Sequence, residues 1–260
     1  MNYWLRILFN WYSSFFIFQR TISWSIVYIV SIIIVIFDDV KKFFKMIKVI
    51  LTGATGMVGE GVLLECLQND KVKEILSISR KSCNISHPKL KELLVSDFLK
   101  LEDYSAKLVG YDACFYCAGV SSLGMDEEKY TKLTYDTTVH FAKVLSDINP
   151  SMNFIYVSGT STDSTEKGKV MWARVKGKTE NDLHKLPFKG QYNFRPGFMS
   201  HFKEQKNIKF IFKIFAAIIP SLFPKSSLTL QEVGRAMINA TIDSYPKNIL
   251  EIADIKSISN

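Results

Sequence analysis

Three glycines stand at a spacing that suits phosphate binding, in the turn Gly53-Ala-Thr-Gly-Met-Val-Gly59. A turn of this kind at the start of a helix offers free N–H groups and the positive end of the helix dipole to phosphate oxygens. We expect Gly53 to permit the tight turn, Gly56 to let the backbone approach a pyrophosphate, and Gly59 to let the helix pack on the preceding strand. The expected ligand contacts are residues of the turn itself: Gly53, Thr55, Gly56, Met57, Val58 and Gly59.

The elements around this turn are those that a phosphate-binding turn requires. Ile47–Thr52 is a short β-branched run, typical of a buried parallel strand. After the turn, apolar residues recur three and four positions apart from Val58 to Leu67, which predicts a helix. The spacing G-x-x-G-x-x-G differs from the G-x-G-x-x-G dinucleotide fingerprint, so the assignment depends on the strand and the helix. Together they predict a dinucleotide-binding turn.

The second predicted strand, Glu74–Ser79, ends about 20 residues after Gly59 and is followed by Arg80 and Lys81. Enzymes that use NAD usually have a carboxylate here, which binds the ribose 2′-hydroxyl and would repel a 2′-phosphate. A guanidinium can instead clasp that phosphate. The sequence therefore favours NADP(H) over NAD(H) as the cofactor; the alternative is that Arg80 is an ordinary surface arginine.

The following chain keeps the alternation of strands and helices that a doubly wound sheet requires. Further strands are predicted at Glu92–Ser96, Ala113–Cys117, Asn153–Val157 and Gln191–Arg195, with a long helix over about 126–148. The predicted fold class is therefore α/β, a doubly wound parallel sheet of the Rossmann type, which binds its ligands at the carboxyl edge of the strands. That edge adds further expected cofactor contacts: Asp97, which could reach the adenine, Phe98, Cys117, Ala118 and Gly119.

Several short motifs resemble the atypical and extended short-chain dehydrogenase/reductases, in the epimerase/dehydratase-like branch that includes NmrA-like NAD(P)-binding proteins. The motifs are Thr52–Gly59, Asp97, Cys117-Ala-Gly119, Tyr156-Val-Ser158, Met171–Glu180 and Arg195-Pro-Gly197. The similarity covers roughly residues 47–199 and weakens toward the end of the chain. It implies an NAD(P)-binding Rossmann domain over 46–199 and a small-molecule substrate with a carbonyl or hydroxyl group.

The resemblance also implies a Tyr-x-x-x-Lys pair on the helix that begins near Met171. In that family the lysine lowers the pKa of the tyrosine and holds the ribose, a serine from the fifth strand orients the substrate, and the tyrosine transfers the proton as hydride moves. Here Lys176 takes the lysine position, also as a cofactor contact, and Ser158 or a near neighbour takes the serine position. Trp172 stands where the tyrosine is expected, and an indole N–H is far too weak an acid to shuttle protons.

This departure leaves two functions open. The first is an NADP(H)-dependent oxidoreductase or epimerase-like enzyme in which another group supplies the proton. The candidates are Ser158, Thr160, Ser161 and Asp163 on one loop, and Tyr130 or Tyr135 from the preceding helix. The second is a catalytically silent NADP(H)-binding regulatory or assembly protein, in which Lys176 keeps a role in binding the ribose. Lys176 could also be one more surface lysine on a basic helix.

The first 45 residues differ in composition from the rest of the chain. Residues 21–37 carry no charge and as a helix would extend roughly 25 Å, the short end of what spans a bilayer. Four lysines follow within about a dozen residues, whereas only Arg6 and Arg20 precede, so the positive-inside rule places the next domain in the cytoplasm. We expect a hydrophobic transmembrane anchor here; a buried helix and a start of translation at Met46 are the alternatives.

Residues 200–260 are expected to complete the fold on the substrate side, with a small helical cap. The apolar segment 208–220 suits such a cap or contact with a bilayer surface. Thr229 and Glu232 have the spacing of a capping box and predict a final helix to about Ile242. Ile249–Ile252 is expected as an edge strand.

Composition and spacing argue against several other functions. The net charge of +8 comes from scattered lysines and arginines and not from the patch typical of nucleic-acid binders. The four histidines are far apart, so no metal site is expected, and the chain has no G-x-S-x-G elbow of a serine hydrolase. Cys114 and Cys117 lie on a predicted strand, where side chains three residues apart point to opposite faces, so no redox pair is expected. No sequence feature indicates an oligomeric state.

Overall fold

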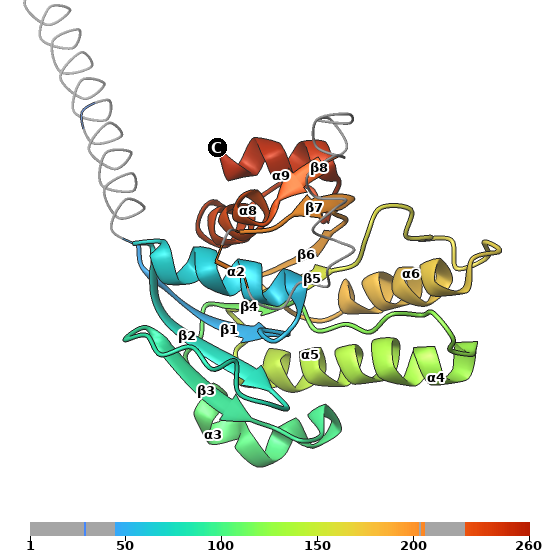
Figure 1. Cartoon of the computed structure of the whole chain (residues 1–260), viewed down its shortest axis with the longest axis horizontal. Helices are drawn as coiled ribbons and strands as arrows, with labels where there is room; N and C mark the ends of the chain where they lie inside the picture. The colour runs from blue at the N-terminus through green and yellow to red at the C-terminus, as the bar shows by residue number, and fades with distance from the viewer. Residues whose placement is uncertain (1–28, 30–44, 203, 206–226) are drawn as a thin grey trace, which may run out of the picture. The chain divides into compact units, whose positions relative to one another are not determined.

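The computed structural model describes Ile29 and residues 45–202, 204–205 and 227–260 of the 260-residue chain. Residues 46–260 belong to one compact unit (Figure 1). Of the expected anchor at 21–37 only Ile29 is described, and the apolar segment 208–220 lies wholly outside the described residues. Within the described part, no helix is both long enough and apolar enough to cross a bilayer.

A seven-stranded parallel sheet forms the centre of the unit, in the order β3-β2-β1-β4-β5-β6-β9. Its strands are β1 (Ile47–Thr52), β2 (Val72–Ser79), β3 (Leu90–Leu94), β4 (Ala113–Tyr116), β5 (Asn153–Val157), β6 (Gly190–Phe194) and β9 (Ile249–Leu250). The order reverses at β1, where the chain leaves β3 and crosses to β4. This arrangement confirms the predicted doubly wound sheet, and its switch point between β1 and β4 is where such sheets bind ligands.

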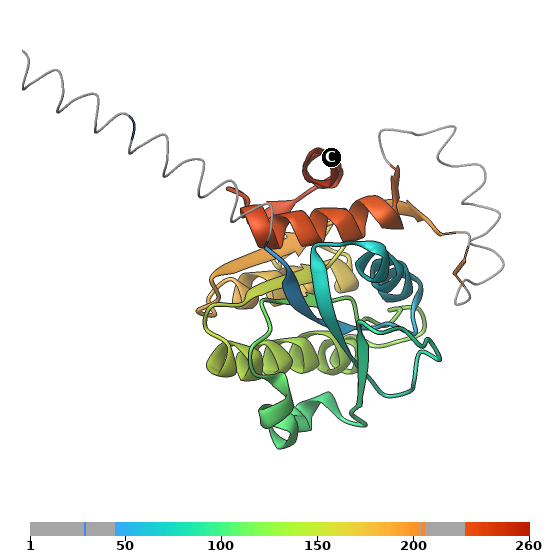
Figure 2. The same cartoon turned by 90° about the vertical axis from the view of Figure 1, so that its left-hand side faces the viewer.

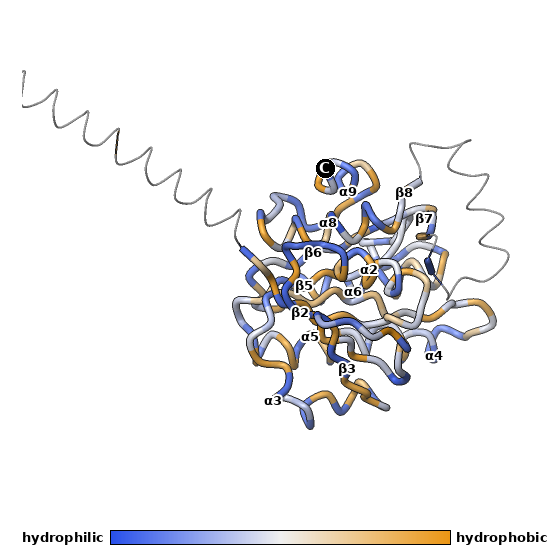
Figure 3. Tube along the Cα trace, turned by 60° about the vertical axis from the view of Figure 1, so that its left-hand side comes forward, coloured by the Kyte–Doolittle hydropathy of each residue, from blue (hydrophilic) through white to orange (hydrophobic). Residues whose placement is uncertain are grey.

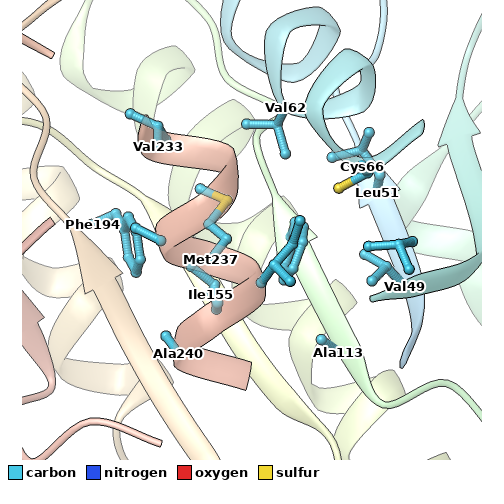
Figure 4. Packing of buried hydrophobic residues seen from close by; sticks show 14 of the residues in the cluster. Val49, Leu51, Val62, Cys66, Ala113, Ile155, Phe194, Val233, Met237 and Ala240 are labelled. Carbon is cyan, nitrogen blue, oxygen red and sulfur yellow. The ribbon is translucent and has the colours of Figure 1, made fainter. Parts of the chain in front are cut away.

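Alternation along the strands divides the core between the two faces of the sheet. In β1, Val49 and Leu51 belong to one buried cluster and Ile50 to the other, because successive side chains of a strand point to opposite faces. Figure 4 shows the first cluster, where Met237 of a covering helix packs over Ile155 and its neighbours. Both faces are covered at β1, which explains why this strand is a nearly continuous apolar run.

Two layers of helices cover the sheet (Figures 1 and 2). One layer holds α2 (Met57–Gln68), α8 (Leu230–Asp243) and α9 (Ile252–Ser259); the other holds α3 (Ser105–Leu108), α4 (Glu127–Thr131), α5 (Thr137–Ile148) and α6 (Met171–Leu183). In Figure 2, α8 lies between the sheet and α9. Figure 3 shows hydrophobic and hydrophilic residues alternating along α8, as expected of a helix with one buried side.

The predicted capping box is present at the start of α8. Thr229 Oγ1 accepts a hydrogen bond from the Glu232 N–H (3.1 Å), and Glu232 Oε2 accepts one from the Thr229 N–H (2.6 Å). These two bonds satisfy donors that the first turn of a helix otherwise leaves free. The described part of 200–260 therefore includes two helices that complete the layer begun by α2.

Several boundaries differ from the sequence prediction. The helix expected over 126–148 is divided into α4 and α5 by a π-helical turn, η2 (Lys132–Asp136). The expected strand Ile249–Ile252 ends at Leu250, because Glu251 and Asp254 form a second capping box that starts α9. Tertiary contacts also add a short parallel pair, β7 (Phe198–Ser200) with β8 (Ser227–Thr229), and a 3₁₀ helix η1 (Phe98–Tyr104).

Candidate functional site

A cavity of about 280 Å3 opens at the switch point, at the carboxyl ends of β1 to β4. Its lining residues are Gly53, Thr55, Gly56, Ser79, Arg80, Ser96, Asp97, Phe98, Tyr116, Cys117, Ala118, Gly119, Val120, Leu133 and Thr137. The volume lies near the lower end for ligand pockets, which suits one half of a dinucleotide. The cavity thus brings together most of the expected cofactor contacts.

The three glycines of the turn meet different surroundings. Gly53 has a positive φ of 77°, and a Cβ there would lie 2.7 Å from the Cys117 carbonyl oxygen. A Cβ at Gly59 would collide with the Gly53 carbonyl. Each of these two positions therefore needs glycine for the fold itself.

Gly56 and Gly119 differ, because the protein leaves space beside them. A Cβ at Gly56 would meet the Gly53 carbonyl oxygen at an ordinary 3.4 Å, and one at Gly119 would meet nothing within 4 Å. Both residues line the cavity. The missing side chains therefore leave room for a ligand to approach the backbone, and the residues present fit a dinucleotide.

Hydrogen bonds hold the turn against its neighbours. The Gly56 N–H donates to the Gly53 carbonyl (2.8 Å), and the Ala118 N–H donates to Thr52 Oγ1 (3.1 Å), which joins the ends of β1 and β4. Gln205 Nε2 donates to the Met57 carbonyl (2.7 Å), so a distant part of the chain also supports the start of α2. The first turn of a helix leaves N–H groups without a partner in the helix itself, so the start of α2 can offer donors to a ligand.

Arg80 and Asp97 both line the cavity, at the ends of β2 and β3. The Arg80 side chain is exposed and borders the cavity. Within the described residues, Arg80 forms no ion pair with a carboxylate. Asp97 Oδ1 accepts a hydrogen bond from the Leu99 N–H (3.0 Å) and so starts η1 while lining the cavity.

The two cysteines of the C-x-x-C sequence face different sides of the sheet. Cys114 belongs to one core cluster, and Cys117 packs against the other and borders the cavity. Burial raises the pKa of the Cys117 thiol to about 12. Cys117 therefore presents a neutral group to the cavity. Elsewhere in the described ranges, no three His, Cys, Asp or Glu side chains gather as metal ligands do.

Lys176 is on α6, and its side chain reaches the residue that follows β5, outside the lining of this cavity. Its Nζ donates to the Ser158 carbonyl oxygen (2.5 Å). Burial lowers the pKa of Lys176 to about 8, against an opposing effect of the nearby Glu180 carboxylate. Trp172 stands one turn earlier on α6 and is half-buried.

The Ser158 hydroxyl is engaged inside the protein. Its Oγ donates to Glu180 Oε1 (2.5 Å) and lies 3.2 Å from the Phe194 carbonyl oxygen. Glu180 in turn forms a buried ion pair with Arg195, whose Nε is 3.0 Å from Glu180 Oε1 and whose second nitrogen bonds Glu180 Oε2. Of the predicted catalytic pair, Ser158 therefore meets Lys176 through its main chain and not through its hydroxyl.

The other candidate proton donors are hydrogen-bonded within the protein or buried. Tyr135 donates to Asp182 Oδ2 (2.5 Å), and this bond raises the pKa of Tyr135 to about 12. Tyr130 is only 2% exposed, and burial raises its pKa. Thr160 Oγ1 donates to the Arg195 carbonyl (3.2 Å). The hydroxyls of Tyr135 and Thr160 are thus directed to partners within the protein, and Tyr130 is buried.

The loop before α6 contains the remaining two candidates. Asp163 accepts hydrogen bonds from Thr165 and Gly168, and these lower the pKa of Asp163. Ser161 is exposed and has a positive φ of 69°, an uncommon conformation for serine.

Sequence reasoning missed several residues of the site. Six cavity-lining residues had not been expected: Ser79, Ser96, Tyr116, Val120, Leu133 and Thr137. Leu133 and Thr137 are four residues apart on one predicted helix, which is a signal that they share a face. Of the expected contacts, Met57, Val58, Gly59 and Lys176 lie outside the lining. Glu180 was part of the motif that resembled the family, but its partners come from elements distant in sequence.

Comparisons with known proteins agree with this architecture. Residues 49–170 match the model of the NAD dependent epimerase/dehydratase family. Protein fmp52, mitochondrial, of Emericella nidulans is 28% identical over 209 residues, which cover 75% of this chain and 87% of that protein. Leucinostatins biosynthesis cluster protein T of Purpureocillium lilacinum is 30% identical over 141 residues, covering 53% of this chain and 51% of that protein.

Among solved structures, a short chain dehydrogenase from Burkholderia cenocepacia in complex with NADP has a TM-score of 0.58 at 13% identity, covering 80% of this chain and 88% of that chain. UDP-glucuronic acid 4-epimerase from Bacillus cereus in complex with NAD has a TM-score of 0.56 at 15% identity, covering 78% and 77%. At these identities the likeness shows a shared fold. Through residues 49–170, this chain is therefore similar to the NAD dependent epimerase/dehydratase family.

Proposed function

We propose that this protein binds NADP(H) at the switch-point cavity and acts as an oxidoreductase or epimerase on a small molecule with a carbonyl or hydroxyl group. The observation that supports binding most strongly is the space left beside Gly56 and Gly119 in a cavity that the glycine turn borders. Solved structures of the same fold contain NADP in one case and NAD in another. Saturable binding of NADPH to the purified protein tests this proposal.

The preference for the phosphorylated cofactor is supported by Arg80. Its guanidinium borders the cavity at the end of β2, where the ribose of a bound dinucleotide is expected. Since no carboxylate of the described chain pairs with it, the guanidinium is available for the 2′-phosphate. Comparing the dissociation constants of NADPH and NADH tests this preference, and tighter binding of NADH would contradict it.

Lys176 is the residue that we propose to act in the reaction. A bound nicotinamide supplies hydride chemistry, and the protein must hold the ribose and donate a proton to the substrate oxygen. The Lys176 ammonium donates one hydrogen bond to the Ser158 carbonyl, which leaves two N–H groups for other partners. Its lowered pKa of about 8 suits an acid that works near neutral pH.

A catalytically silent dinucleotide-binding protein is the second candidate, and Trp172 favours it. The tyrosine position is occupied by a group without a usable proton, and several hydroxyls nearby are bonded within the protein. Trp172→Tyr separates the two candidates when both proteins are assayed with NADPH against a panel of aldehydes and ketones. Turnover by the wild type supports the enzyme, whereas an inert wild type and an inert variant support the silent binder.

We also propose that residues 1–45 anchor the domain on the cytoplasmic side of a membrane. The uncharged stretch 21–37, followed by lysines, supports this role. The related fmp52 proteins are named as mitochondrial, which makes mitochondria one compartment to examine. Carbonate extraction of cells that produce the full chain or residues 46–260 tests the anchor. Only the full chain should stay with the membranes, and its release into the supernatant would contradict the proposal.

A further inference from the structure

We propose that Glu180 and Arg195 are positioning residues. Their buried ion pair turns the Ser158 hydroxyl inward and thereby presents the Ser158 carbonyl to the Lys176 ammonium. The inference deepens the proposed function and rests on it, because it concerns how Lys176 is held for its proposed role in the reaction. It assigns Ser158 to the support of Lys176 instead of contact with the substrate.

The first step is the burial of the pair. Glu180 is 1% exposed and Arg195 8%. A carboxylate removed from water in this way requires a cation and hydrogen-bond donors around it. Arg195 supplies two nitrogens and Ser158 supplies a hydroxyl, so both oxygens of Glu180 have donors.

The second step is the effect on Ser158. Because Oγ donates to Glu180 (2.5 Å), the side chain is held in the interior, 7% exposed. The Ser158 N–H donates to the Phe194 carbonyl (2.9 Å), which ties the residue to β6 as well. With its hydroxyl and N–H both engaged, Ser158 has its carbonyl oxygen in a defined place, where Lys176 Nζ bonds it at 2.5 Å.

The third step is the reach of Arg195 into neighbouring elements. Its guanidinium also donates to Ser164 Oγ (2.6 Å) on the loop before α6 and to Glu251 (3.3 Å) at the start of α9. These partners, together with Glu180, come from α6, the loop before it and the start of α9. A single cation therefore joins α6, which carries Lys176, to the loop before it and to the start of α9.

The fourth step concerns charge. Glu180 follows Lys176 by one helical turn, and its carboxylate raises the pKa of the lysine, opposing the larger effect of burial. Arg195 offsets that negative charge by pairing with it. Removing the Glu180 charge would leave the positive charge of Arg195 without its buried partner and should lower the pKa of Lys176. A role of Glu180 confined to packing would not predict this change.

The test measures how fast the Lys176 amine reacts with deuterated acetic anhydride, in the full-length protein over a range of pH. Only the neutral amine reacts, so the midpoint of the rate profile reports the pKa. Mass spectrometry follows Lys176 and, as an internal reference, the exposed Lys178 on the same helix. Glu180→Gln removes the charge and keeps an acceptor for Ser158, whereas Glu251→Gln removes only the outer partner of Arg195 and is the matched control.

We expect the wild-type midpoint near 8 and a lower midpoint in Glu180→Gln. A fall of about one unit would raise the neutral fraction at pH 7 roughly fivefold. Ser158→Ala keeps the ion pair and removes only the hydroxyl, so it serves if Glu180→Gln fails to fold. Without its hydroxyl, Ser158 should no longer hold its carbonyl oxygen in place for the Lys176 ammonium. The charged form of Lys176 then loses a hydrogen bond, so labelling of Lys176 at pH 7 should be about fivefold faster, with Lys178 unchanged.

A wild-type profile of Lys176 in Ser158→Ala, or in a folded Glu180→Gln, would overturn the inference. A shift of equal size in Glu251→Gln would also overturn it, because that change leaves Glu180 in place. The readout needs no dinucleotide. Absence of NADPH binding in a separate titration would thus refute the proposed function and leave this result interpretable.

Discussion

Gly56→Ala is expected to weaken dinucleotide binding while leaving the protein folded. Gly56 has φ −105° and ψ 164°, an extended conformation that alanine adopts without strain. The new methyl would meet the protein only at the Gly53 carbonyl oxygen, 3.4 Å away. Glycine-to-alanine changes at compatible positions stabilise by about 0.4–1 kcal/mol, so the free energy of unfolding should change by less than about 1 kcal/mol.

The effect on binding should be larger because the methyl would fill the space through which a phosphate approaches the backbone. Loss of one charge-assisted hydrogen bond costs about 1.5–3 kcal/mol. The dissociation constant of NADPH should therefore rise roughly 10- to 150-fold. Fluorescence titration of the wild type and the variant measures this ratio, and urea unfolding measures stability.

Gly53→Ala is the matched control at the other end of the same turn. Its φ of 77° costs an alanine about 1–2 kcal/mol, and the new Cβ would lie 2.7 Å from the backbone of Cys117. This variant should lose at least about 2 kcal/mol of stability. The reasoning would be refuted if Gly56→Ala bound NADPH like the wild type, or if it lost as much stability as Gly53→Ala.

Three further predictions concern single side chains. Arg80→Gln should weaken NADPH binding about tenfold or more with little effect on NADH binding. Lys81 lies outside the cavity lining, so Lys81→Gln should change the binding of neither cofactor. Equal losses for both cofactors in Arg80→Gln would contradict the role of Arg80. Thr229→Ala should lower the free energy of unfolding by about 1 kcal/mol through loss of the helix cap, as measured by urea denaturation; an unchanged midpoint would show that the cap is not needed. Tyr135→Phe should lower the free energy of unfolding by about 1 kcal/mol, because it removes the hydrogen bond to Asp182. It should leave NADPH turnover unchanged, and a loss of turnover would show that Tyr135 donates the proton.

The strands of the sheet could be located from the sequence because local sequence largely determines buried parallel strands, although several of their bounds are displaced by one or two residues. β1 and β5 have the predicted bounds, Ile47–Thr52 and Asn153–Val157, since a short β-branched run between turn residues has few other interpretations. The capping box at Thr229 was predicted for the same reason, because all its atoms lie within four residues.

The features that sequence reasoning missed depend on contacts between distant residues. The inward direction of the Ser158 hydroxyl follows from Glu180 and Arg195, which are 22 and 37 positions away. A motif shows that such residues are present, but their pairing emerges only when β5, α6 and β6 assemble. The division of the helix over 126–148 by the π-helical turn η2 likewise has no local signal in composition or periodicity.

The most direct measurement is a titration of the purified protein with NADPH and with NADH, followed by fluorescence and by thermal shift. We expect one saturable site, with NADPH bound more tightly than NADH. At a hundredfold excess over its dissociation constant, NADPH should stabilise the fold by about 2.7 kcal/mol, a rise in melting temperature of roughly 5–11 °C for a domain of this size. Tighter binding of NADH would contradict the role of Arg80, and binding of neither cofactor would contradict the central claim that the glycine turn holds a dinucleotide.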